Sequence, residues 1–453
     1  MPTVSRRHFL RTAAAASLAG SALDAFAQTA LAGKPLRVGL IGSGWYGKSD
    51  VFRLLQVAPA EVVAVCDPDR LMREDAAQVI GARQASRKIP EGYGDYRELL
   101  KRHELDIAVI GTPDHWHTLP AIAAMEAGAH VYLQKPVSVD VLEGEAILAA
   151  ARRLKRTVQI GTQRRSTPHL IEAKEKVIDA GLLGKIGHAE MFSYYHMRRG
   201  GKGPDVPVPE HLDWEMWTGP APMRPYHEGI HPGSWRSYWE YGNGFVGDMC
   251  VHMLDMVRWL LGLGWPKRIT SSGGVFMPTE SRANVTDTQT ASFDFGDFTA
   301  TWQHRTWGAP TDPRYPWGAV LYGEKGTLRA GVQRYEFIPM GKDAPTLSAE
   351  PLIEKEKYPD DATEKRIEII AASATRGHMR DFLAAIQTGG LPVADISQGH
   401  TSSASCILAN LALKTGRALS YDPATRTVPG DAEATGLLRR AYRAPWVHPG
   451  AAL

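Results

Sequence analysis

A glycine-rich turn that directly follows an apolar strand constrains the fold of this chain more than any other feature. Residues 36–41 have the apolar pattern of a buried strand, and the turn after them reads Gly42-Ser43-Gly44-Trp45-Tyr46-Gly47. Gly42 permits the tight turn, Gly44 lets backbone amides approach a pyrophosphate, and Gly47 allows a helix to pack closely on the strand. The helical pattern that follows predicts a Rossmann domain whose helix N-terminus faces a dinucleotide.

An acidic residue at the end of the next strand supports this prediction. The strand pattern of residues 61–66 ends on Asp67, twenty residues after Gly47. An acid at this place accepts hydrogen bonds from the adenine ribose and repels a 2′-phosphate, so the sequence favours NAD over NADP. Arg70 is close in sequence and leaves NADP open. A glycine-rich turn in an unrelated α/β domain is the alternative, but it gives Asp67 no role.

Two further predicted strands end in polar loops. The loop 111–117 follows residues 106–110, and Gln134-Lys135-Pro136 follows residues 130–133. In an open parallel sheet, ligands bind beyond the carboxyl ends of the strands. Both loops are therefore expected to line the dinucleotide and substrate site. Lys135 lies at such a position, and the proline after it stiffens the backbone. We therefore expect this lysine to have a role in the site rather than to be a surface charge without function.

These loops resemble the glucose–fructose oxidoreductase / inositol dehydrogenase / MocA family. Residues 112–117 read Thr-Pro-x-x-x-His, and Lys135-Pro136 follows at the family's spacing. Gln134 stands where the family usually has Glu, which removes one negative charge beside the lysine. Residues 161–165, Gly-Thr-Gln-Arg-Arg, are similar to the family's cofactor- and substrate-facing loop at the start of a second domain.

A second glycine-rich stretch gives the strongest match to this family. Residues 241–247 precede a helix pattern Asp-x-x-x-His-x-x-Asp, formed by Asp248, His252 and Asp255. Their spacing places these side chains on one helix face. The resemblance implies that His252 is the general acid/base, that Asp248 is its partner, and that Lys135 polarises the reacting oxygen.

The chemistry of hydride transfer agrees with these roles. When a carbinol loses a hydride, its hydroxyl proton must also leave, so a base with a near-neutral pKa is needed. A carboxylate would orient the imidazole, and a cationic lysine would stabilise a developing alkoxide. The alternatives are structural: Asp248 as an acid at a helix N-terminus, and His252 as a buried core histidine.

The predicted site contains catalytic, cofactor-binding and substrate-binding residues. The expected catalytic residues are Lys135, Asp248 and His252. The expected cofactor contacts are Gly42, Ser43, Gly44, Trp45, Tyr46, Gly47, Asp67, Thr112, Pro113, His117, Gln134, Lys135 and Arg164. The expected substrate contacts are Arg165, Tyr195, His196, Asp248 and His252. No metal is expected, because no histidines or cysteines have the spacing of zinc ligands.

The N-terminus has the pattern of an export signal. Arg6 and Arg7 precede an Ala-rich apolar run, and residues 25–27 form an Ala-Phe-Ala cleavage site. This pattern predicts a twin-arginine signal over residues 1–27, with the translocation machinery as a partner and a periplasmic mature protein. The apolar run is too short for a membrane span. Because this route carries folded proteins, it also suits a tightly bound cofactor; an exposed amphipathic helix is the alternative.

The length of 453 residues predicts two domains. The expected boundaries are 34–158 for the Rossmann domain and 159–453 for a domain that binds substrate and forms oligomers. Strand-like runs at 189–195, 288–295, 298–304, 319–322 and 327–330, and helix patterns at 170–180, 248–261, 367–387 and 399–414, favour an α+β second domain. The resemblance implies that its sheet is large, open and mostly antiparallel.

Composition and family resemblance together limit the function. The net charge of +3 without a long Lys/Arg run gives no reason to expect nucleic acid binding. The resemblance implies a sugar or polyol substrate and a homodimer or homotetramer. A redox-neutral glycoside hydrolase or lyase that oxidises the sugar transiently, and a sugar-binding protein with a vestigial site, are the alternative functions.

Overall fold

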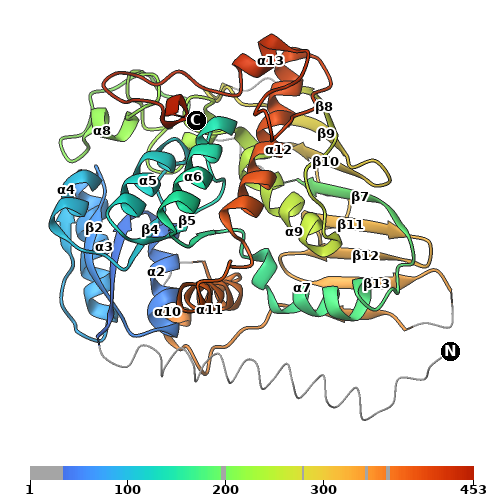
Figure 1. Cartoon of the computed structure of the whole chain (residues 1–453), viewed down its shortest axis with the longest axis horizontal. Helices are drawn as coiled ribbons and strands as arrows, with labels where there is room; N and C mark the ends of the chain where they lie inside the picture. The colour runs from blue at the N-terminus through green and yellow to red at the C-terminus, as the bar shows by residue number, and fades with distance from the viewer. Residues whose placement is uncertain (1–33, 195–199, 278–279, 342–344, 364–367, 453) are drawn as a thin grey trace.

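The computed structural model describes residues 34–194, 200–277, 280–341, 345–363 and 368–452 as two sheets with helices around them (Figure 1). The predicted export signal lies outside these residues. The first sheet has the order β3-β2-β1-β4-β5-β6, and all of its pairs are parallel. The second has the order β14-β13-β12-β11-β7-β10-β9-β8 and is antiparallel except between β7 and β10. The predicted fold class is confirmed.

The first sheet is a Rossmann sheet. Its strands are β1 (Leu36–Ile41), β2 (Ala60–Cys66), β3 (Glu91–Tyr93), β4 (Ile107–Ile110), β5 (His130–Leu133) and β6 (Val158–Ile160). Its helices are α2 (Trp45–Val57), α3 (Arg70–Arg83), α4 (Tyr96–Arg102), α5 (Thr118–Glu126) and α6 (Val141–Leu154). Helices cover both faces, which is why strands such as β4 are buried along their whole length. The strand order reverses between β1 and β4, where such sheets bind ligands.

A helix from the C-terminal part of the chain completes the Rossmann core. Helix α11 (Ala372–Thr388) packs on α2, and its Met379 and Phe382 share a buried cluster with Phe52. This helix falls within the range 159–453 that the sequence assigns to the second domain. The Rossmann layer is therefore built from two segments that are far apart in the chain.

The second sheet carries its helices on one face. Its strands are β7 (Ile186–Ser193), β8 (Arg268–Gly274), β9 (Thr288–Asp294), β10 (Thr299–Arg305), β11 (Trp317–Gly323), β12 (Gly326–Gly331), β13 (Tyr335–Pro339) and β14 (Leu347–Ala349). Helices α7 (Pro168–Ala173), α9 (Val251–Leu261) and α12 (Ile396–Thr415) contribute to the buried core against this face. Short helices occur at α8 (Trp214–Thr218), α10 (Asp360–Thr363) and α13 (Ala432–Gly436). No described helix is long and apolar enough to span a membrane.

Two predicted helices begin or end in wider turns. The pattern at 248–261 becomes a π-helical turn, Val246–Cys250, followed by α9, and the pattern at 170–180 becomes α7 followed by a π-helical turn, Lys174–Ile178. Such π-helical turns are frequent at functional sites. The first of them carries Asp248 into the region between the two sheets.

Residues 206–241 form a separate layer, which we call the cap segment. Its buried aromatic and apolar side chains form their own cluster, whose largest members are Trp214, Trp217, Trp235, Tyr238 and Tyr241. Three of the twelve tryptophans of the sequence belong to this cluster. The cap segment leaves the second domain and lies against the loops of the Rossmann sheet, as its backbone hydrogen bonds show.

Candidate active site

The glycine-rich turn has the stereochemistry that a dinucleotide requires. Gly42 has a φ of +87°, and a Cβ there would lie 2.3 Å from the backbone nitrogen of Thr112. A Cβ on Gly47 would lie 2.2 Å from the carbonyl oxygen of Gly42. A Cβ on Gly44 would instead meet only Met72, at 3.7 Å, so this side of the turn is open. The turn therefore leaves space for a pyrophosphate at the start of α2.

Asp67 closes the turn from the end of β2. Its carboxylate accepts hydrogen bonds from the backbone nitrogen of Ser43 at 2.9 Å, from the Ser43 hydroxyl at 3.1 Å and from the backbone nitrogen of Asp69 at 3.0 Å. Burial raises the pKa of Asp67, although these hydrogen bonds act to lower it. Asp67, Gly42 and Gly44 line a cavity of about 160 Å³, which lies where sheets of this type bind the adenosine half of a dinucleotide.

The cap segment forms the opposite wall of this cavity. Met216, Trp217, His231 and Trp235 line it. The segment is fastened to the loop after β2, because Arg70 donates its backbone N–H to His211 at 2.8 Å, and Asp213 donates to Pro68 at 3.1 Å. Nε2 of His231 lies 2.8 Å from the carboxylate of Asp69. This cavity is thus lined both by the Rossmann turn and by the cap segment.

A larger cavity of about 630 Å³ adjoins it beyond the carboxyl ends of β4 and β5. The predicted cofactor residues that line one or both cavities are Gly42, Gly44, Trp45, Tyr46, Asp67, Thr112, Pro113, His117, Gln134, Lys135 and Arg164. Ser43 and Gly47 do not line either cavity but stabilise the turn, Ser43 through its hydrogen bond with Asp67 and Gly47 through its close approach to Gly42. The three predicted catalytic residues all line the larger cavity. Residues separated by more than 100 positions in sequence therefore meet here.

Lys135 and Asp248 form a buried ion pair in this cavity. The Lys135 ammonium donates to the Asp248 carboxylate and, at 3.0 Å, to the Asp248 backbone carbonyl. Arg236 Nε lies 3.4 Å from the same carboxylate. Burial alone would raise the pKa of Asp248, but Lys135 and Arg236 outweigh it and lower that pKa. Among the described residues, this carboxylate is engaged by cations, so the predicted pairing of Asp248 with His252 is replaced by a pairing with Lys135.

His252 lies one turn further along the same helix. Burial, together with the charges of Lys135 and Arg164, lowers its pKa well below the ordinary value of 6.5. Its Nδ1 is buried and has no hydrogen-bond partner within the described residues. Its ring packs edge-on against Trp317, with centroids 5.3 Å apart. His252 is thus neutral in the cavity, in the state that accepts a proton, but its pKa lies below the near-neutral value that we expect of the base from the sequence.

Gln134 and His117 brace the loops that carry these groups. The Gln134 amide donates to the buried Asp50 carboxylate at 2.6 Å, and burial raises the pKa of Asp50 to about 8. Nδ1 of His117 lies 2.6 Å from the carbonyl oxygen of Pro136, and Nε2 lies 3.1 Å from that of Thr112. Burial lowers the pKa of His117 to about 4. A neutral ring donates from only one nitrogen, and the Nδ1 contact with Pro136 is the one that joins the two loops.

The two arginines of the 161–165 segment have different environments. Arg164 lines the larger cavity, and its guanidinium lies 5.3 Å from the centre of the Trp317 ring. Arg165 instead bonds Asp255 with two nitrogens, at 2.7 and 2.8 Å, in the interior. Arg165 does not line either of the two cavities, because a buried carboxylate holds its guanidinium, and its predicted contact with substrate stays a prediction. Tyr195 and His196, also predicted substrate contacts, lie outside the described residues.

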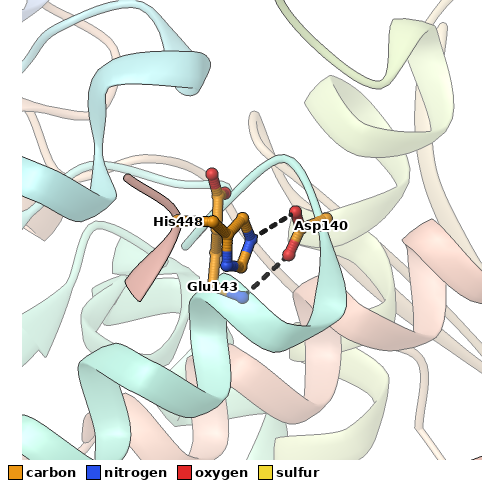
Figure 2. A group of neighbouring side chains, drawn as sticks. All are labelled: Asp140, Glu143 and His448. Carbon is orange, nitrogen blue, oxygen red and sulfur yellow. Dashed lines mark hydrogen bonds and ion pairs between the residues drawn. The ribbon is translucent and has the colours of Figure 1, made fainter. Parts of the chain in front are cut away.

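Among the described residues, one group of side chains with metal-ligating atoms lies where the C-terminal segment meets the start of α6. Asp140, Glu143 and His448 come together in the interior, and Figure 2 shows the imidazole facing the Asp140 carboxylate. Nε2 of His448 lies 2.9 Å from that carboxylate, which also accepts the backbone N–H of Glu143 at 2.8 Å and that of Arg440 at 2.8 Å. Because N–H donors already occupy these oxygens, the group holds the C-terminal segment on α6.

Sequence reasoning missed Asp114 and Arg236, which line the larger cavity, and His231, which lines the smaller one. Asp114 lies in the recognised loop, but its position is variable in the pattern and gave no signal. His231 and Arg236 belong to the cap segment, where tryptophan density was the available signal. Their roles depend on where the cap segment folds, which residue spacing does not reveal.

Known proteins share this architecture. Residues 36–162 match the profile "Oxidoreductase family, NAD-binding Rossmann fold", and residues 169–271 match "Oxidoreductase family, C-terminal alpha/beta domain". A levoglucosan dehydrogenase structure with NADH and L-sorbose has a TM-score of 0.64 at 16% identity, over 86% of this chain and 99% of that one. An aldose-aldose oxidoreductase structure from Caulobacter crescentus has a TM-score of 0.62 at 18% identity, over 85% of this chain and 100% of that one.

Curated relatives match over a shorter region. An Alpha-N-acetylgalactosaminidase of Shewanella oneidensis is 29% identical over 268 residues, which cover 53% of this chain and 51% of that protein. A Glycosyl hydrolase family 109 protein of Shewanella pealeana is 28% identical over 258 residues, which cover 52% of this chain and 51% of that protein. The chain thus spans about half the length of these relatives. The family profiles confirm the resemblance and the NAD cofactor: the chain belongs to the glucose–fructose oxidoreductase / inositol dehydrogenase / MocA family of NAD-binding oxidoreductases.

Proposed function

We propose that this protein is a periplasmic enzyme that transfers a hydride between tightly bound NAD and a hydroxyl or carbonyl group of a sugar or polyol. The observation that carries the proposal is the meeting of Lys135, Asp248 and His252 in the cavity next to the dinucleotide turn. A cationic donor, a carboxylate that fixes it and a neutral imidazole are the groups that carbinol oxidation needs.

The side chains divide the proton chemistry among them. NAD, when bound, accepts the hydride from the reacting carbon or returns it. Lys135 donates a hydrogen bond to the reacting oxygen and stabilises the charge that develops there. Asp248 holds the ammonium in position from its π-helical turn. His252 accepts the hydroxyl proton during oxidation, because it is neutral, and gives a proton back during reduction.

The cap segment supports the retention of the cofactor. The adenosine cavity is walled by Trp217, His231 and Trp235 as well as by the Rossmann turn. The contacts of His231 with Asp69, and of Arg70 with His211, hold the cap segment against this site, so they would help to retain a bound dinucleotide. A retained cofactor suits a protein that folds before export and then works where free NAD is scarce.

The proposed substrate class rests on the polar cavity and on the names of similar structures. Lys135, Arg164, Arg236 and Asp248 surround the cavity, and Trp317 offers an aromatic wall. Such a combination binds a ring with several hydroxyls. The similar structures are named for levoglucosan and aldose substrates. For the oligomer, we propose a homodimer or homotetramer through the helix-free sheet face, where Phe192 stacks on Tyr194.

A second candidate function is redox-neutral glycoside cleavage by transient oxidation of the sugar. The names of the curated relatives favour it, since they are glycoside hydrolases at 28–29% identity over about half of their length. The same residues would carry out its oxidation step. The two functions differ in whether the hydride returns to the same sugar.

Two measurements on the purified exported protein test the proposal. The protein is denatured, and any released nucleotide is identified by mass spectrometry. Candidate sugars are then added to intact protein, and the absorbance of reduced nicotinamide is followed. Stoichiometric NAD that one sugar reduces and a second sugar reoxidises supports the oxidoreductase. Bound NAD with glycoside cleavage and no lasting reduction supports the second candidate, and absence of bound nucleotide contradicts cofactor retention.

A further inference from the structure

A buried carboxyl group in the larger cavity has no assigned role in the mechanism above. Asp114 begins the short helical turn after β4, and its residue is only 4% exposed. It lines the cavity together with Lys135 and Asp248. Within the described residues, no side chain or backbone group hydrogen-bonds its carboxyl, and no cation lies within ion-pair distance. Its donor and acceptor capacity is therefore available to a molecule in the cavity.

The neighbourhood of Asp114 keeps this carboxyl uncovered. A Cβ on Gly242 would lie 3.3 Å from its Oδ2, so the glycine leaves that oxygen free of side-chain contact. The charged groups that act on it are Arg236, Lys135, Asp248 and Arg440. Arg440 is engaged elsewhere, since it donates to the carbonyls of Trp239 and Gly242. Arg236 and Lys135 are shared with Asp248.

The two carboxyl groups of the cavity therefore differ in charge. Cations hold the pKa of Asp248 below its ordinary value, so it is a carboxylate. Burial raises the pKa of Asp114 to about 7, although Arg236 and Lys135 oppose the rise. A protonated carboxyl donates a hydrogen bond, which a carboxylate cannot do. Neighbouring carboxyls whose pKa values are pushed apart have different chemical roles.

We infer that protonated Asp114 binds the substrate by donating a hydrogen bond to one of its oxygens. This oxygen is next to the reacting oxygen, which contacts Lys135 and His252. This inference rests on the proposed function. Carbohydrates carry oxygens on adjacent carbons, so a second donor in the same cavity meets the neighbouring oxygen, which is either a free hydroxyl or a glycosidic oxygen. Asp114 thereby selects substrates with two adjacent oxygens over simple alcohols.

The test compares Asp114→Ala with Asp114→Asn in the NAD-containing enzyme. Removing a hydrogen bond to a buried partner weakens binding by about tenfold to hundredfold. Asp114→Ala should therefore raise KM by that factor at about pH 6, with kcat changed far less. Asp114→Asn still donates from its amide, so its KM should stay within about threefold. Unchanged nucleotide content and thermal unfolding show that both variants are folded.

The pH dependence gives a signature that a structural role would not produce. The wild-type KM should rise as the pH passes about 7, because the donor proton is lost. The KM of Asp114→Asn should show no such rise. An equal KM for Asp114→Ala and wild type, or the same pH dependence in wild type and Asp114→Asn, overturns the inference.

Substrate analogues identify the partner oxygen. With the analogue that lacks the neighbouring hydroxyl, wild type and Asp114→Ala should bind equally if that hydroxyl is the partner. If the difference instead disappears when a methylene replaces the glycosidic oxygen, that oxygen is the partner. A difference that survives both replacements overturns the inference.

A binding measurement separates this inference from the proposed function. If no sugar reduces the NAD of the wild type, the proposed function fails. Sugar affinity is then measured by quenching of tryptophan fluorescence, because Trp317 lines the same cavity. Weaker binding by Asp114→Ala supports the role of Asp114 without turnover, and equal binding contradicts it.

Discussion

The ammonium group of Lys135 is bound by Asp248 through two different acceptors, the side-chain carboxylate and the backbone carbonyl at 3.0 Å. The two residues are 113 positions apart and come from different domains. Asp248 lies in a π-helical turn, where the hydrogen bonding differs from that of a regular α-helix. The ion pair therefore fixes the orientation of the Lys135 side chain before a substrate arrives.

We predict that Lys135→Ala lowers the rate of NAD reduction by sugar by about 10²- to 10⁴-fold, because the developing alkoxide loses its cation. Asp248→Asn should lower it less, since the backbone carbonyl still accepts from the lysine. Single-turnover absorbance of reduced nicotinamide measures both rates. Nucleotide content should be unchanged in both variants, and a Lys135→Ala enzyme with near-normal rates would exclude the proposed role.

The pH dependence of sugar oxidation should report the environment of His252. A general base works when it is deprotonated, and burial lowers the pKa of this histidine well below 6.5. At saturating sugar, the rate of NAD reduction should therefore remain flat between about pH 8 and about pH 6 and fall only under more acidic conditions. His252→Ala should lower the rate at every pH. A wild-type rate that falls with a midpoint near 6.5 would contradict a buried, neutral histidine.

Cofactor release should depend on the cap segment. His231 Nε2 lies 2.8 Å from Asp69, and His211 Nε2 lies 3.7 Å from the same carboxylate with its side chain 32% exposed. We predict that His231→Ala speeds NAD release by about tenfold, whereas His211→Ala changes it little. Exchange of bound NADH, followed by its fluorescence, measures the rate. Equal rates in the two variants would show that the His231 contact does not retain the cofactor.

The Arg165–Asp255 pair should act on stability. Both side chains are almost fully buried and are joined at 2.7 and 2.8 Å. Removing Arg165 takes away the cation that is hydrogen-bonded to the buried Asp255 carboxylate, so Arg165→Ala should lower the free energy of unfolding by roughly 3–5 kcal/mol. Burial raises the pKa of Asp255, but Arg165 outweighs it and lowers that pKa. The contribution of Asp255 is therefore present above its ordinary pKa and lost as the pH falls through the lowered value.

Urea unfolding at neutral and acidic pH measures this effect. Arg70→Ala offers a surface control, because its ion pair with Glu74 is exposed on both sides. That substitution should change stability by less than about 1 kcal/mol. An Arg165→Ala protein that is stable but has a raised KM would instead support the predicted role of Arg165 in substrate binding.

The sequence alone was sufficient for the parts of the site that depend on local stereochemistry. The turn from Gly42 to Gly47 tolerates no side chain at its two contact positions, and Asp67 must follow at the end of the next strand. Strand ends in a parallel sheet lie at one edge, so Thr112 and Lys135 could be brought together from their place in the pattern. These constraints act over short stretches of chain, which is why residue spacing reveals them.

Tertiary structure decided which polar groups pair and which face the cavity. Arg164 and Arg165 are adjacent in sequence, yet only Arg164 lines the cavity, because Asp255 holds Arg165 in the interior. Asp248 lies four residues before His252 on one helix but pairs with Lys135 of the other domain. A buried charge pairs with the opposite charge that tertiary packing brings close to it. The distance between two such groups cannot be read from a local sequence pattern, because they are far apart in the chain.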